Sequence, residues 1–149
     1  LGDMATLNLI PMVLDRLSRG ETPKIFGTDY PTPDGTCVRD YIHVRDLAAA
    51  HIAALDHLAG GRDMAEHVFN VGTGKGSSVR EVVSRVIAAT GLDVEPEELG
   101  RRAGDPPQLI GDAERIGAVL GWKAEHDLDD IVASSFSSWQ ADPARKHIG

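Results

Sequence analysis

The sequence of 149 residues has little cysteine, no excess of positive charge and no long apolar run. Cys37 is the single cysteine, so an internal disulfide is impossible, and no Cys and His residues have zinc-site spacing. The net charge of -8 disfavours nucleic-acid and membrane partners, which bind clustered positive charge. No stretch approaches the roughly 20 apolar residues of a membrane helix, and no signal-peptide pattern opens the chain. We expect a protein of the reducing cytoplasm.

The chain also lacks a standard nucleotide-binding loop. Gly72, Gly74 and Gly76 lie between a predicted strand and a predicted helix, which is the usual context of such a loop. A dinucleotide loop follows the pattern G-x-G-x-x-G, and here the third glycine comes one residue too early. A Walker loop needs its lysine after the last glycine, whereas Lys75 precedes Gly76. These glycines predict a tight turn whose backbone can approach a ligand closely.

Hydrophobic residues make up 42% of the chain, enough to form the core of one domain over residues 1–149. The first residue is not methionine, which suggests a fragment. Apolar residues at helical spacing, with glycines beyond several of the expected helix ends, predict helices over residues 8–18, 45–59, 79–90, 113–120 and 128–139. Residues 24–27, 37–44 and 67–71 are predicted strands, the last one buried. Ser78 and Glu81 fit a capping box at the third helix. This alternation indicates an α/β (mixed α+β) fold.

Isolated candidates for chemistry are weak. His43 falls within a predicted strand and His51 on a helix face, where a packed, hydrogen-bonded histidine is more frequent than a ligand. Cys37 has only Arg39 nearby to lower its pKa, so we expect an inert thiol. The acidic residues at 95–98 fit a solvated face.

Two stretches are more specific: residues 25–48 (IFGTDYPTPDGTCVRDYIHVRDLA) and residues 102–105 (RAGD). Together they resemble the UDP-glucose/UDP-galactose 4-epimerases of the extended short-chain dehydrogenase family. Related nucleotide-sugar dehydratases share the segment around Arg39 but have a shorter loop in place of residues 29–36. The resemblance runs from Asn8 to the final helix and covers nearly the whole chain.

The resemblance implies the C-terminal substrate-binding domain of a Rossmann-type nucleotide-sugar epimerase, without its N-terminal NAD-binding sheet. NAD would be held by that missing half, which also carries a Tyr-x-x-x-Lys pair. Tyr30 and Tyr41 instead have Asp34 and Arg45 four residues later. The complete enzyme would interconvert UDP-galactose and UDP-glucose through a 4-keto intermediate, within galactose metabolism, and would dimerise through the missing half. This chain alone would be inactive.

The resemblance also implies the UDP-binding residues. Arg39 and Arg102 would hold the diphosphate, a task suited to the guanidinium fork, and Asp105 would orient a ribose hydroxyl. The alternatives are an ion pair of Arg39 with Asp40 or Asp46 and a solvated Arg102. By the same resemblance, Asn8 and Leu9 would lie beside the phosphate and sugar. Lys24, Ile25 and Phe26 would flank uracil, and Leu109 would lie beside the sugar 2-substituent.

Two other functions remain open from the sequence. The same anchors would serve a UDP-pentose or UDP-N-acetylhexosamine 4-epimerase, because both substrates contain UDP. A nucleotide-sugar-binding module without catalysis is the alternative from another class. For Leu109, packing under the turn at Pro106 and Pro107 is an alternative to a role in the sugar pocket.

Overall fold

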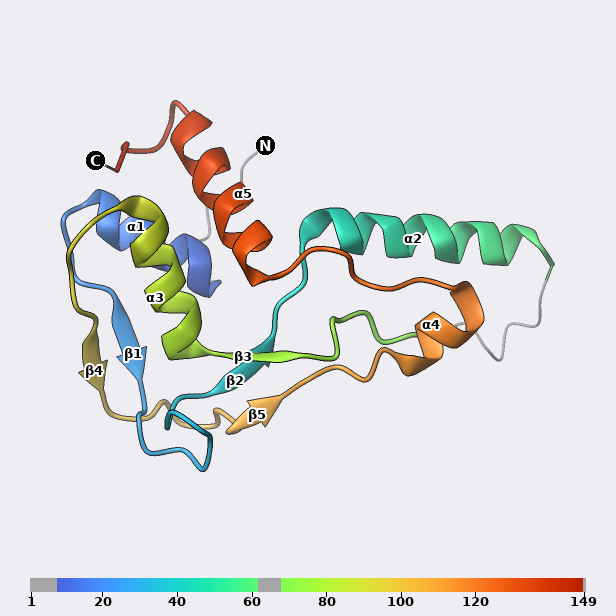
Figure 1. Ribbon diagram of the computed structural model, residues 1–149, viewed down its shortest axis with the longest axis horizontal. Helices are drawn as coiled ribbons and strands as arrows, with labels where there is room; N and C mark the ends of the chain where they lie inside the picture. Colours follow the sequence, from blue (N-terminus) through green and yellow to red (C-terminus); the bar gives the residue numbers. More distant parts are fainter. Residues whose placement is uncertain (1–7, 62–67, 149) are drawn as a thin grey trace.

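The structure is a computed structural model that describes residues 8–61 and 68–148. Figure 1 shows helices and short strands gathered at one end, with a long helix reaching to the other. The mixed α/β fold is as predicted. The helices are α1 (Leu9–Ser18), α2 (Val44–Ala59), α3 (Val79–Thr90), α4 (Glu114–Leu120) and α5 (Leu128–Ala141). The strands are β1 (Lys24–Phe26), β2 (Val38–Asp40), β3 (Gly76–Ser78), β4 (Glu97–Leu99) and β5 (Gln108–Leu109).

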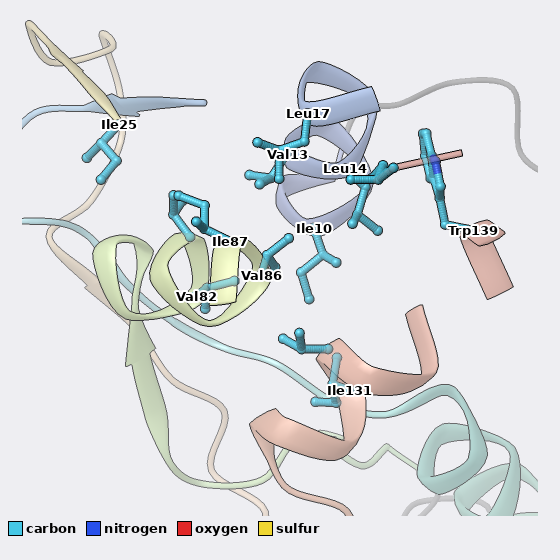
Figure 2. Packing of buried hydrophobic residues seen from close by; sticks show 13 residues of the cluster. Ile10, Val13, Leu14, Leu17, Ile25, Val82, Val86, Ile87, Ile131 and Trp139 are labelled. Atoms are coloured by element: carbon cyan, nitrogen blue, oxygen red, sulfur yellow. The ribbon is translucent and has the colours of Figure 1, made fainter. Parts of the chain in front are cut away.

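The main core lies between α1, α3 and α5. Apolar side chains of α1 repeat at helical spacing, so one face of the helix is buried against the other two. Figure 2 shows these side chains converging from the three helices, with Ile25 of β1 at the margin. The helical members of this cluster include Ile10, Val13, Leu14 and Leu17 of α1, Val82, Val83, Val86 and Ile87 of α3, and Ile131, Val132 and Trp139 of α5.

Two small sheets lie beneath this core. In the first, β1 pairs in parallel with β4. In the second, β2 is the central strand, antiparallel to β3 and parallel to β5. Arg39 stands opposite Ser77 on one side and Leu109 on the other. The segment 100–107 connects β4 to β5, so it joins the two sheets along one edge.

Most helix ends agree with the sequence. The Ser78 hydroxyl accepts the N–H of Glu81 at 3.0 Å, which is half of the predicted capping box. The Glu81 carboxylate pairs instead with Arg85 at 3.1 Å. Gly91 ends α3 with a φ of 72°, in the left-handed region that glycine adopts without strain.

Three predictions about strands need correction. The strand expected over 37–44 is limited to Val38–Asp40, and His43 is the N-cap of α2 rather than a strand residue. Residues 68–71 form no strand, and Val68 is 78% exposed; they have no partner strand in the described part of the chain. Residue 67 of that prediction lies outside the described residues. Strands β3, β4 and β5 were not predicted, and β3 begins at Gly76, where the sequence predicted a tight turn.

Helix α2 is covered on one side only. Its buried residues are Asp46 and Ala50, whereas Val44, Ile52 and Leu55 are at least 60% exposed. His51 is exposed and hydrogen-bonds the carbonyl of Leu47, so the predicted packing of His51 is wrong.

Across residues 8–61 and 68–148, no helix has both the length and the apolar character required to cross a membrane.

Candidate functional site

A cavity of about 800 Å³ opens between α1, β1, β2 and the segment 100–107. Its lining includes seven of the nine predicted site residues, Asn8, Leu9, Lys24, Phe26, Arg39, Arg102 and Asp105. These residues come from four segments that are far apart in the sequence. The fold therefore brings the predicted set together at one place.

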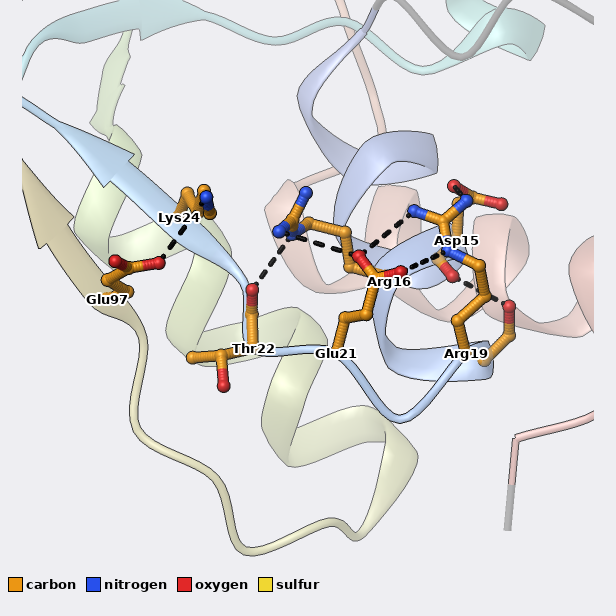
Figure 3. A network of polar contacts seen from close by, with 8 residues as sticks. Asp15, Arg16, Arg19, Glu21, Thr22, Lys24 and Glu97 are labelled. Atoms are coloured by element: carbon orange, nitrogen blue, oxygen red, sulfur yellow. Dashed lines mark hydrogen bonds and ion pairs between the residues drawn. The ribbon is translucent and has the colours of Figure 1, made fainter.

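The cavity is rich in positive charge although the whole chain is acidic. Arg16, Lys24, Arg39 and Arg102 line it, together with the two acidic residues Asp40 and Asp105. Figure 3 shows the contacts of Arg16 and Lys24 with the carboxylates of Glu21 and Glu97. Both ion pairs are long, with Arg16 3.5 Å from Glu21 and Lys24 3.5 Å from Glu97. A site with this charge attracts an anionic ligand.

Arg39 is held in place by the loop that carries Asp105. Its Nη1 donates to the carbonyls of Val38 and Pro106, both at 2.9 Å, and its Nη2 lies 3.5 Å from the Asp105 carboxylate. Guanidinium has five N–H groups, and these contacts use three of them. The other two have no protein partner within the described ranges. The alternative pairing with Asp40 or Asp46 is wrong.

Arg102 lies over an aromatic ring. Its guanidinium carbon is 3.8 Å from the centre of the Phe26 ring, within the range of a cation–π contact. Arg102 is also exposed and lies outside the helices and strands, as the alternative of a solvated loop arginine expects, so its role in holding the diphosphate stays a prediction. The neighbouring Arg101 differs, because it is bound to Asp29 at 2.6 Å and does not line the cavity.

Tyr41 is a cavity residue that the site prediction missed. Burial raises its pKa to about 12, although the nearby Arg39 acts in the opposite direction. Its hydroxyl therefore stays protonated throughout the neutral range and can donate a hydrogen bond. Its position directly after Arg39 and Asp40, at the end of the strand that leads into the site, could have identified it from the sequence.

Two predicted site residues lie outside the cavity lining. Ile25 is fully buried in the core, so only its backbone is near the site. Leu109 is 63% exposed beside Arg39 in the sheet, which contradicts the alternative that it packs under the proline turn.

Asn8 does line the cavity, and its side chain makes no capping bond to α1. In the described residues, no three His, Cys, Asp or Glu side chains are grouped to hold a metal ion.

Comparison with known proteins finds similar epimerases. A sequence profile described as the NAD dependent epimerase/dehydratase family matches residues 3–72. A UDP-glucose 4-epimerase of Azospirillum brasilense is 50% identical over 124 residues, which is 83% of this chain and 35% of that protein. This chain is therefore similar in sequence to proteins of the epimerase/dehydratase family. The similarity agrees with the resemblance carried by residues 25–48 and 102–105.

Further relatives cover the same portion. A probable UDP-arabinose 4-epimerase of Oryza sativa subsp. japonica is 45% identical over 116 residues, which is 78% of this chain and 26% of that protein. A crystal structure of UDP-glucose 4-epimerase from Bifidobacterium longum, in complex with NAD+ and UDP, superposes with a TM-score of 0.77 at 41% identity. That match covers 94% of this chain and 41% of the solved one. This chain thus spans less than half the length of each of these proteins.

Proposed function

We propose that this chain is the carboxyl-terminal, UDP-binding part of an NAD-dependent UDP-glucose 4-epimerase. The observation that carries the proposal is the cationic cavity, which Arg39 and Arg102 both line and where each keeps N–H groups without a partner among the described residues. Paired N–H donors match the oxygens of a diphosphate. The names of the relatives support the sugar nucleotide as the ligand.

The neighbouring residues suit the other parts of UDP. Phe26, stacked under Arg102, offers its ring and backbone to uracil, and Lys24 stands two residues away on the same strand. Asp105 accepts a hydrogen bond from a ribose hydroxyl. Asn8 and Leu9 lie at the start of α1, where the helix dipole favours the negative charge of the phosphates. This chain would therefore hold the nucleotide while the sugar reacts.

The described residues do not fit NAD. Their glycine turn lacks the spacing of a dinucleotide loop, and its N–H groups of Thr73 and Gly74 are already bound to Asp40. In the complete protein, hydride uptake and return at C4 of the sugar is the chemistry supplied by bound NAD. We assign NAD, the catalytic Tyr-x-x-x-Lys pair and the contacts of a homodimer to the part of the protein outside this chain, and the complete protein to the cytoplasm. This chain alone is expected to be inactive.

Substitution of the two arginines tests the proposal. Arg39→Ala and Arg102→Ala should each weaken UDP binding by about one to two powers of ten, because a hydrogen bond to a charged group contributes about 1.5–3 kcal/mol. Titration calorimetry with UDP measures this loss. Arg101→Ala is the matched control, since Arg101 is bound to Asp29 outside the cavity. An affinity for UDP equal to that of the wild type in all three variants would refute the assignment of the diphosphate to Arg39 and Arg102.

A UDP-pentose 4-epimerase is the second candidate, favoured by the Oryza relative named for UDP-arabinose. Both functions need the same UDP anchor, so the cavity supports them equally. Turnover of UDP-galactose and UDP-arabinose by the complete protein separates them.

A further inference from the structure

The carboxylate of Asp40, at the end of β2, is surrounded by four hydrogen-bond donors. Its Oδ1 accepts the N–H of Thr73 at 3.0 Å and the hydroxyl of Thr73 at 2.5 Å. Its Oδ2 accepts the N–H of Gly74 at 3.1 Å and the N–H of Gly111 at 3.2 Å. A carboxylate offers about four acceptor positions, so this one is fully used.

The donors belong to segments remote from Asp40 in the sequence. Thr73 and Gly74 precede β3, and Gly111 follows β5. Because β3 and β5 are the strands on either side of β2, the Asp40 carboxylate ties both neighbouring connections to the central strand. A single side chain thus joins three segments at one edge of the sheet.

The glycines around Asp40 allow this close approach. A Cβ atom on Gly72 would lie 2.5 Å from Oδ2 of Asp40, a distance that no side chain tolerates. Gly74 has a φ of 70°, which an L-residue adopts only with strain. Successive N–H groups that converge on one point in such a turn form an anion-binding nest.

We propose that the glycine turn is an anion-binding nest whose ligand is the internal carboxylate of Asp40, and that Asp40 is a positioning residue for the UDP site. Arg39 and Tyr41, the two neighbours of Asp40, both line the cavity. Anchoring the side chain between them fixes the backbone from which both extend. The role in UDP binding rests on the proposed function, whereas the nest does not.

The nest also explains why the glycine turn looks like a phosphate loop without having the spacing of one. Its N–H groups do bind an anion, but that anion is supplied by the chain itself. An external phosphate finds the donors occupied. Removing the carboxylate should therefore expose a site for a small anion of the same shape.

Chemical rescue tests the nest directly. Asp40→Ala removes the carboxylate and leaves a space that formate can fill. We expect this variant to melt below the wild type and to gain melting temperature in sodium formate, but not in an equal concentration of sodium chloride, because a ligand of the folded state stabilises it. If the variant is unfolded in buffer, formate should restore its helical circular dichroism. An equal response to formate and chloride overturns the nest.

A second variant and a control sharpen the result. Asp40→Asn fills the same space, but its NH₂ group faces donors, so it should melt lower than the wild type and formate should not rescue it. Asp112→Ala is the control, since Asp112 accepts a single bond, from the N–H of Glu114 at 2.9 Å, and no rescue is expected. Rescue of Asp40→Asn to the extent seen in Asp40→Ala would contradict internal ligation.

Titration with UDP tests the positioning role separately. The affinity of Asp40→Ala for UDP should fall about ten-fold and recover in formate. Unchanged affinity, together with formate rescue of the melting temperature, overturns the positioning role and leaves the nest standing. If the wild-type chain does not bind UDP while formate still rescues Asp40→Ala, the proposed function fails and the nest is supported.

Discussion

Among single residues, Asp46 is a carboxylate with only 3% exposure at the first turn of α2. Its burial acts to raise the pKa, but hydrogen bonds from the backbone and ring of His126, at 3.0 Å and 2.8 Å, outweigh this and lower the pKa below its ordinary value of 3.8. A carboxylate with a lowered pKa stabilises the folded state above its unfolded pKa, and this contribution disappears as the pH falls through the folded value.

Replacement of Asp46 should therefore matter at neutral pH and less in acid. We expect Asp46→Asn to lower the free energy of unfolding by about 1.5–3 kcal/mol at pH 7, and the difference from the wild type to shrink below about pH 4. Urea unfolding between pH 7 and pH 2 measures it. Asp56→Asn, on an exposed residue of the same helix, is the control. A difference that is constant with pH would contradict the role of the ionised carboxylate.

Leu109 stays a prediction for the sugar specificity of the complete protein. Its exposed side chain beside Arg39 is free to contact a group outside this chain's cavity. Leu109→Ser should raise kcat/KM for UDP-N-acetylgalactosamine relative to UDP-galactose. The change should not exceed about 1–3 kcal/mol, which is the usual limit for discrimination by size at an apolar wall. Leu92→Ser is the control at another exposed leucine. If the ratio of kcat/KM values does not change, Leu109 is not the gate.

The sequence predicted part of the site at the residue scale. Arg39, Arg102 and Phe26 were found because they fall in the segments that resemble the epimerases. The stacking of Arg102 on Phe26 was not predicted, since it joins residues 76 positions apart. Arg16 and Tyr41 were missed because neither an arginine on a helix nor a tyrosine directly after a strand has a distinctive pattern.

Within the elements, α1 and α2 differ in how much they are buried. Leu14 of α1 is 2% exposed in the main core, whereas Leu55 of α2 is 65% exposed. Leu14→Ala should lower the free energy of unfolding by about 2–5 kcal/mol, through lost burial and the cavity left behind. Leu55→Ala should change it by less than about 0.5 kcal/mol. Urea unfolding of this matched pair measures both, and similar losses would contradict the packing described.

Helices were easier to predict than strands because their signals are local. Gly91 and the Ser78 cap lie within or beside the helix that they bound, and the structure confirms both. Strands of two or three residues depend on a partner elsewhere in the chain. This explains why β4 and β5 were missed, and why residues 68–71, with apolar side chains but no partner in the described residues, form no strand.

On the scale of the whole molecule, the cavity requires long-range assembly. Helix α1 contributes Leu9, β1 contributes Phe26, β2 contributes Arg39, and the segment before β5 contributes Arg102. Periodicity and spacing do not place these segments together. The resemblance did so because it carried three-dimensional information from related proteins, and the fold described here agrees with it for seven of nine residues.

A crystal structure of this chain with UDP tests the central claim most directly. We predict that the diphosphate lies between Arg39 and Arg102 within hydrogen-bond distance of both guanidinium groups, with uracil against Phe26 and a ribose hydroxyl at Asp105. Such a structure needs no contribution from the rest of the protein. UDP bound elsewhere, or a cavity without UDP at a saturating concentration, would contradict the account.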